Sequence, residues 1–219
     1  MAGKLTLPKI CESFGIFFLI WTVRVLCLSG FPPAGQSLWI QQLLAELLKG
    51  ILWIGFAFYM IQRYHTRLWL KPQKMLLHPI ATRSLVLPAA LFVLYFLVGN
   101  AVRNGAVRMN PDFHPSMLIG TVLAAGIFEE FLFRGWFYNA CASVMERSFA
   151  NYLSSAFFVL IHYPGWLYTG CSLEVILGRS IGIYVLGLIF GWSFRRSRSI
   201  WPPVFLHMLW NLLSITIGV

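Results

Sequence analysis

Residues 116–138 have the sequence SMLIGTVLAAGIFEEFLFRGWFY, in which Glu129, Glu130 and Arg134 interrupt an otherwise apolar run. The run is long enough to cross a bilayer as a helix, which takes about 20 residues. An ionised side chain near the bilayer centre costs about 2.5–3.5 kcal/mol on insertion scales, and such side chains usually face a bundle interior or a wet cavity. The chain has only 7 acidic residues, so two of them in this run indicate a function.

The rest of the chain has the composition of an integral membrane protein. Of its 219 residues, 58% are hydrophobic and 11% are charged, and a soluble domain carries more charge. The apolar runs predict an all-α fold, a polytopic bundle of about seven transmembrane helices. The expected spans are Ser13–Ser29, Leu43–Ile61, Ser84–Val102, Ser116–Tyr138, Phe149–Tyr168, Leu173–Phe194 and Ile200–Val219. We expect one integrated bundle, with N-terminal helices and an interfacial linker in residues 1–115 and a catalytic helical core in residues 116–219.

The net charge of +10 agrees with a membrane topology. If the N-terminus is cytoplasmic, most lysines and arginines fall in short loops on the cytoplasmic side, which is the positive-inside pattern. Positive loops on that side also attract anionic lipid headgroups. The basic residues are therefore explained by the membrane topology. We expect the lipid bilayer to be their partner, and we expect no nucleic-acid partner.

The two glutamates have different neighbours on a regular helix. Successive residues are about 100° apart, so Glu130 and Arg134 are i,i+4 neighbours and predict an ion pair. Glu129 faces elsewhere and has no partner on its own helix, and Gly126, one turn earlier, is expected to leave open space beside it. Glu129 is therefore the candidate general base. The alternative is that all three charged residues form a structural salt-bridge cluster that locks the helix.

Two further expected spans carry polar side chains at membrane depth. The fifth contains Phe158-Val-Leu-Ile-His162 directly before Tyr163-Pro164-Gly165, which predicts a helix break beside an imidazole. In the last span His207 and Asn211 are four residues apart and share a helix face, so their side chains can hold an oxyanion. Taken alone, a histidine such as His162 is more often a helix-packing residue than a catalyst, and the pair of His207 and Asn211 fits interhelical hydrogen bonding equally well.

These residues form three ordered motifs, Glu129-Glu130-x-x-x-Arg134, Phe158-x-x-x-His162 and His207-x-x-x-Asn211. The ordered set resembles the motifs of the CPBP family, the CAAX-protease and bacteriocin-processing enzymes, also called the Abi family. The resemblance covers about Ser116 to Asn211. It implies an intramembrane endopeptidase of the glutamate type, a hydrolase that cuts a membrane-associated protein or peptide near its C-terminus.

The resemblance also implies roles for the motif residues. Glu129 is expected to activate the hydrolytic water, with His162 helping to bind and orient it. His207 and Asn211 are expected to stabilise the tetrahedral oxyanion. The structural support of the site is assigned to Glu130, Arg134 and Phe158. The small size of the chain favours an enzyme of the prokaryotic cell (inner) membrane that acts on a membrane-associated peptide or protein substrate.

Glutamate and histidine side chains can also ligate zinc. If zinc is present, Glu129, His162 and His207 are its expected ligands. The chain has no H-E-x-x-H spacing, and Asn211 suits an oxyanion donor better than a metal ligand. We therefore expect hydrolysis without a metal.

A non-enzymatic function is the alternative to proteolysis. Such a chain can be a membrane immunity or scaffold protein, or a small transporter that uses Glu129 as a proton-linked carboxylate.

Overall fold

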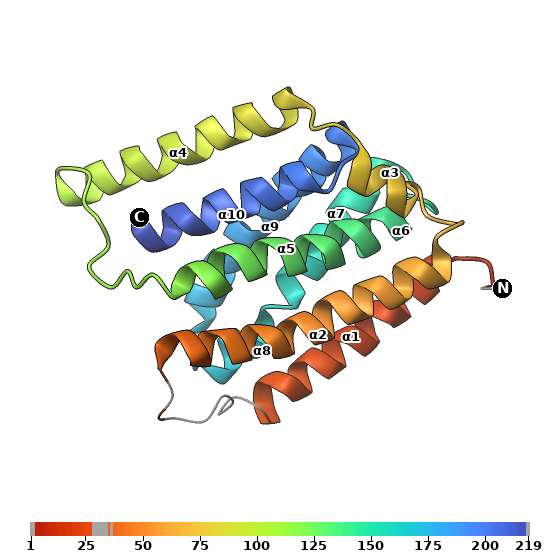
Figure 1. The fold of residues 1–219 in the computed structure, drawn as a ribbon, viewed down its shortest axis with the longest axis horizontal. Helices are drawn as coiled ribbons and strands as arrows, with labels where there is room; N and C mark the ends of the chain where they lie inside the picture. Colours follow the sequence, from red (N-terminus) through yellow and green to blue (C-terminus); the bar gives the residue numbers. More distant parts are fainter. Residues whose placement is uncertain (1–2, 28–34, 36, 218–219) are drawn as a thin grey trace.

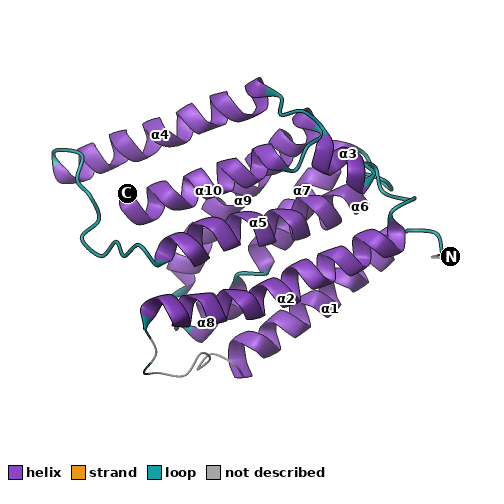
Figure 2. Cartoon of the chain, viewed as in Figure 1, coloured by secondary structure: helices purple, strands orange, loops and turns teal. Residues whose placement is uncertain are grey.

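The computed structural model describes residues 3–27, 35 and 37–217, which form helices joined by loops. In chain order the helices are α1 (Leu7–Cys27), α2 (Leu38–Tyr64), α3 (Pro72–Leu77), α4 (Thr82–Asn104), the continuous run η1 (Leu118–Ala124), α5 (Ala125–Glu130), η2 (Phe131–Tyr138) and α6 (Asn139–Cys141), then α7 (Arg147–Leu160), α8 (Tyr163–Tyr168), α9 (Leu173–Ser197) and α10 (Trp201–Thr216). The long helices lie side by side as a bundle (Figure 1). Figure 2 shows only helices and loops in the described chain, so the expected all-α fold is confirmed.

Four helices are long and apolar enough to cross a membrane, namely Leu7–Cys27, Trp39–Tyr64, Thr82–Asn104 and Leu173–Ser197. Only 17–28% of their apolar stretches is buried inside the protein, so most of these side chains need lipid around them. This makes the chain an integral membrane protein. The count of about seven spans and the cytoplasmic N-terminus stay predictions. The expected ends of the first and last spans, Ser29 and Val219, lie outside the described residues.

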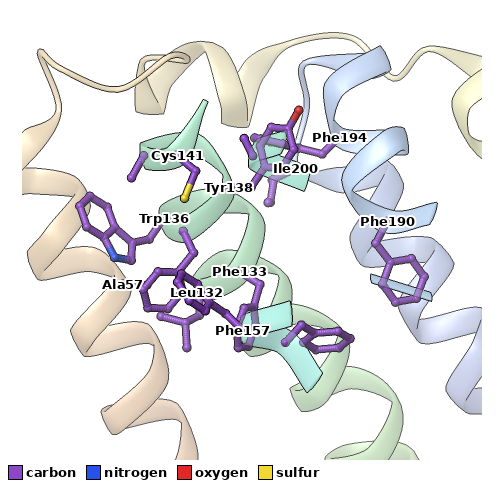
Figure 3. Packing of buried hydrophobic residues seen from close by; sticks show 14 of the residues in the cluster. Ala57, Leu132, Phe133, Trp136, Tyr138, Cys141, Phe157, Phe190, Phe194 and Ile200 are labelled. Carbon is purple, nitrogen blue, oxygen red and sulfur yellow. The ribbon is translucent and has the colours of Figure 1, made fainter. Parts of the chain in front are cut away.

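The helical run from η1 to α6, green in Figure 1, lies between α2 and α10. From residue 132 to residue 141 every side chain of this run is buried, and Leu132, Phe133 and Trp136 are each 0% exposed. Figure 3 shows these side chains packed between Ala57 of α2 and Phe157 of α7. A helix that is apolar on every side is typical of a buried core position. The run that carries the two glutamates is therefore the centre of the bundle.

This central run is not a regular α-helix. The segments η1 and η2 are π-helical and flank α5, the short α-helix that ends at Glu129 and Glu130. The assumption of regular α-helical geometry over residues 116–138 is therefore wrong outside α5. An apolar run with no polar face has no periodicity from which i→i+4 and i→i+5 turns can be distinguished. Short π-helical segments are frequent at functional sites.

The linker between α2 and α4 is tied to the bundle by hydrogen bonds. Leu70 and Met75 are buried. The Asn139 amide of α6 donates to the Leu70 carbonyl at 2.9 Å and accepts from the Leu70 N–H at 2.7 Å. The Ile200 N–H donates to the Met75 carbonyl at 3.1 Å. The linker thereby holds the start of α10 close to the end of the central run.

Replacing Asn139 with alanine should destabilise the fold. Asn139 is 0% exposed, and its loss leaves both backbone groups of Leu70 buried without these partners, which costs about 1–3 kcal/mol for each unsatisfied group. We expect a clearly lower thermal midpoint of unfolding for Asn139→Ala in detergent. Asn151→Ala is the control, since the Leu188 carbonyl that accepts from Asn151 lies inside α9 and keeps its helical partner. Equal midpoints for the two variants would contradict a stabilising role for the hydrogen bonds between Asn139 and the Leu70 backbone.

Candidate active site

The four residues expected to be catalytic line a single cavity. Glu129 at the end of α5, His162 between α7 and α8, and His207 and Asn211 on α10 surround a space of about 340 Å³. The cavity wall also includes Lys49 of α2. Three motifs that are distant in sequence, and one helix without a motif, therefore meet at one place.

Glu130 and Arg134 form the ion pair that their spacing predicts. Arg134 Nη1 lies 2.9 Å from Glu130 Oε1, and both side chains are 0% exposed. Arg134 Nη2 donates to the Gly187 carbonyl of α9 at 2.8 Å. The guanidinium lies 4.8 Å from the centre of the Phe158 ring and 5.3 Å from that of Phe190. These contacts offset the cost of burying two charges and connect α7, α9 and the central run.

Glu130 also accepts a hydrogen bond from His207 of α10. The spacing of the motifs did not predict this contact. The Glu130 Oε1 atom lies 2.8 Å from His207 Nδ1. A carboxylate oxygen only accepts, so the Nδ1 atom carries the proton and donates. The Phe190 ring stacks on the imidazole, with 4.9 Å between ring centres and 18° between planes. These two neighbours direct His207 Nε2 toward Glu129, whose Oε2 lies 3.8 Å away.

His162 lies at the predicted helix break. α7 ends at Leu160 and α8 begins at Tyr163, with Pro164 in the first turn of α8. The His162 Nδ1 atom is 2.7 Å from the Phe158 carbonyl, which only accepts, so Nδ1 is the protonated nitrogen. In the neutral imidazole Nε2 then has a free lone pair and can accept a hydrogen bond. The Phe158 ring stands edge-on to the imidazole at 5.2 Å.

Glu129 faces away from the Glu130 pair, as the helical angles predict, and its charge partner comes from α2. Lys49 Nζ lies 2.8 Å from Glu129 Oε1, and the ammonium is 5.0 Å from the centre of the Trp53 ring. Lys49 belongs to none of the three sequence motifs. The signal that was available is the pair Glu46 and Lys49 inside an apolar span, because such residues are rare in a membrane and usually functional.

The open space expected beside Gly126 is filled. A Cβ atom at this position would lie 2.5 Å from Met208 Cγ and 3.4 Å from the Val204 carbonyl oxygen. The expectation was wrong because the sequence does not state which helix packs against the glycine. The missing side chain lets α10 approach the central run closely, which brings His207 within reach of both glutamates.

Asn211 lies one turn beyond His207 on α10. Its Nδ2 atom donates to the Thr121 carbonyl of η1 at 2.7 Å, which fixes the amide plane. The amide group carries a second N–H, and Asn211 lines the same cavity as His207. The His207 imidazole and the Asn211 amide thus provide two nitrogens on one wall.

The arrangement does not fit a metal site. In the described part of the chain, no three His, Cys, Asp or Glu side chains are placed so that they can hold a metal ion. Glu129 Oε1 already binds the Lys49 ammonium. A positive lysine ammonium beside the central ligand also disfavours a cation there. We therefore derive no step through zinc.

Together, the fold and the cavity define an integral membrane protein with a buried site of carboxylate, imidazole and amide groups. Residues 111–213 match the family model described as type II CAAX prenyl endopeptidase, Rce1-like. This segment, which contains all three motifs, is similar to the CAAX-protease family, a family of peptidases. No curated protein matches the chain, and no solved structure does.

The buried ion pair predicts the effect of removing one partner. Arg134→Met leaves the Glu130 carboxylate without its arginine, which should destabilise the protein by about 3–5 kcal/mol. We expect poor accumulation in the membrane and a low thermal midpoint. The double variant Arg134→Met/Glu130→Gln should recover much of the loss, because no unpaired charge remains. Arg179→Met, which removes an exposed arginine of α9, is the control. If the double variant is no more stable than Arg134→Met, the unpaired charge of Glu130 is not the cause of the destabilisation.

Proposed function

We propose that the protein is an intramembrane endopeptidase that hydrolyses a peptide bond of a membrane-associated protein or peptide near its C-terminus. The observation that carries the proposal is the convergence of Glu129, His162, His207 and Asn211 on one cavity. The match of residues 111–213 to the model of a peptidase family supports the same reaction class.

In the proposed reaction, Glu129 is the general base. Its Oε1 atom is occupied by Lys49, so Oε2 receives the proton of the water. The lone pair on His162 Nε2 accepts the other hydrogen of this water and orients it. The water oxygen attacks the carbonyl carbon of the scissile bond, and the proton moves to Glu129.

The carbonyl oxygen then becomes an oxyanion, and His207 and Asn211 are the proposed donors to it. His207 Nδ1 already donates to Glu130, so Nε2 can donate at the same time only if the ring is an imidazolium. The Glu130 carboxylate accepts from Nδ1 and fixes the ring, as the aspartate does in a Ser-His-Asp triad. When the intermediate collapses, the C–N bond breaks and Glu129 returns its proton to the leaving amine.

The apolar part of the cavity wall strengthens these interactions. Phe158, Phe190 and Trp210 line the same space as the polar groups. Hydrogen-bond donors that are fixed in a surrounding of low dielectric stabilise a developing charge more strongly than water does. The aromatic wall therefore supports charge stabilisation at membrane depth.

Substitution of the four residues tests the proposal. With purified protein in liposomes and a fluorescence-quenched peptide ending in a farnesylated C-a-a-X sequence, the variants Glu129→Gln, His162→Ala, His207→Ala and Asn211→Ala should each cleave at least about 100-fold more slowly. His78→Ala, an exposed histidine at the end of α3, is the control and should cleave normally. Rates are compared for equal amounts of folded protein, because Glu129→Gln leaves the Lys49 ammonium without its carboxylate.

The same assay separates proteolysis from the non-enzymatic alternatives. Mass spectrometry should identify two defined products with the wild-type protein and none with Glu129→Gln. The same peptide without its farnesyl group shows whether the lipid is required. Normal cleavage by the variants would refute the assignment of the residues, and no cleavage of either peptide by the wild type would refute the proposed substrate class.

Independence from metal is a separate prediction. Because no three ligating side chains are gathered in the described part of the chain and Lys49 places a positive charge beside Glu129, we expect the cleavage rate to be unchanged after treatment with 1,10-phenanthroline. Metal analysis of the purified protein should find less than one zinc ion per chain. A loss of cleavage that added zinc restores would contradict this prediction.

A further inference from the structure

The closest charged partner of Glu129 comes from outside the segment that matches the family. Lys49 belongs to α2, and the match begins only at residue 111. The Lys49 side chain is 15% exposed and that of Glu129 is 9% exposed, with 2.8 Å between Nζ and Oε1. The ion pair therefore lies in a site that is largely shielded from water, where a charge without a partner costs several kcal/mol.

The two adjacent glutamates are neutralised in different ways. Glu130 has Arg134 at 2.9 Å and His207 Nδ1 at 2.8 Å. Glu129 has Lys49 at 2.8 Å, while its contact with His207 Nε2 measures 3.8 Å, which is too long for a hydrogen bond. The charge of Glu129 is therefore offset mainly by Lys49.

Two glycines allow α2 to pack closely against the central run, so that Lys49 reaches Glu129. Gly50, next to Lys49, packs on the Phe128 ring, and a Cβ atom there would lie 3.0 Å from the ring. In η1, Gly120 leaves room for Gln42 and Glu46, which are hydrogen-bonded to each other at 3.0 Å. The close approach of α2 to the central run depends on both glycines and places the polar face of α2 at the cavity.

Lys49 and Glu129 lie between two cavities. Both residues and His162 line the 340 Å³ cavity and also a second cavity of about 230 Å³. The second cavity is bordered by Trp21, Trp53 and Trp166 in place of His207 and Asn211. A Glu129 side chain that turned toward this second space would point away from the proposed oxyanion donors. The contact between Lys49 and Oε1 opposes that rotation.

We propose that Lys49 is a positioning residue for Glu129. The ammonium binds Oε1 and thereby directs Oε2 into the cavity that contains His207 and Asn211. This inference rests on the proposed function and adds to it a residue from a helix without a family motif. The scissile bond does not touch Lys49 in this scheme, so Lys49 acts through the orientation of Glu129.

Three variants of Lys49 test the inference in the liposome assay. Lys49→Met keeps the length of the side chain but removes the charge, and it should lower kcat about 10- to 100-fold with KM changed less than about twofold. Lys49→Arg keeps a cation and should recover part of kcat. Lys49→Ala with added propylamine, which supplies a mobile ammonium, should also regain activity in proportion to the amine concentration.

The controls separate positioning from a structural role. Arg179→Met removes a cation of α9 that does not line either cavity and should leave kcat unchanged. Lys49→Met leaves the Glu129 carboxylate unpaired, so its thermal midpoint should fall, and kcat is therefore measured at a temperature at which every variant is folded. Loss of kcat that neither Lys49→Arg nor propylamine rescues would show a structural role and overturn the inference.

Failure of the inference can be distinguished from failure of the proposed function. An unchanged kcat in Lys49→Met, with Glu129→Gln inactive, overturns the role of Lys49 and leaves the proposed function intact. Normal cleavage by Glu129→Gln overturns both. A fall in kcat with Lys49→Met and rescue by either cation supports both.

Discussion

Two buried carboxylates, Glu129 and Glu130, need positive charge inside a protein whose surroundings are apolar. The helices are packed so that one basic side chain lies beside each carboxylate. Arg134 neutralises Glu130 from the next turn of the same run, and Lys49 neutralises Glu129 from α2. An unpaired charge in either position costs several kcal/mol, so α2 and the central run must pack in a single register.

Small residues allow the helices to come close enough for these contacts. Gly126 admits Met208 of α10, and Gly120 admits the hydrogen-bonded pair Gln42 and Glu46 of α2. The central run therefore has α10 on one side and α2 on the other, each carrying polar groups to the same cavity. Aromatic rings then fill the space around the charged groups, and Phe158 lies against the Arg134 guanidinium.

Contacts within a helix were predictable from the sequence, and contacts between helices were not. The ion pair of Glu130 with Arg134 follows from i,i+4 spacing, and the break beside His162 follows from the nearby proline. The contacts of His207 with Glu130 and of Lys49 with Glu129 join helices whose packing no spacing rule describes. The π-helical turns of η1 and η2 were missed for a related reason, because a run that is apolar on all sides has no periodic pattern.

The cavity itself has a consequence for the supply of water. At about 30 Å³ for each molecule in the liquid, a space of about 340 Å³ has room for on the order of ten water molecules. A hydrolytic reaction needs one of them in each cycle. In the proposed reaction the cavity would store this second reactant, and an incoming peptide would displace part of the stored water while leaving one molecule next to Glu129.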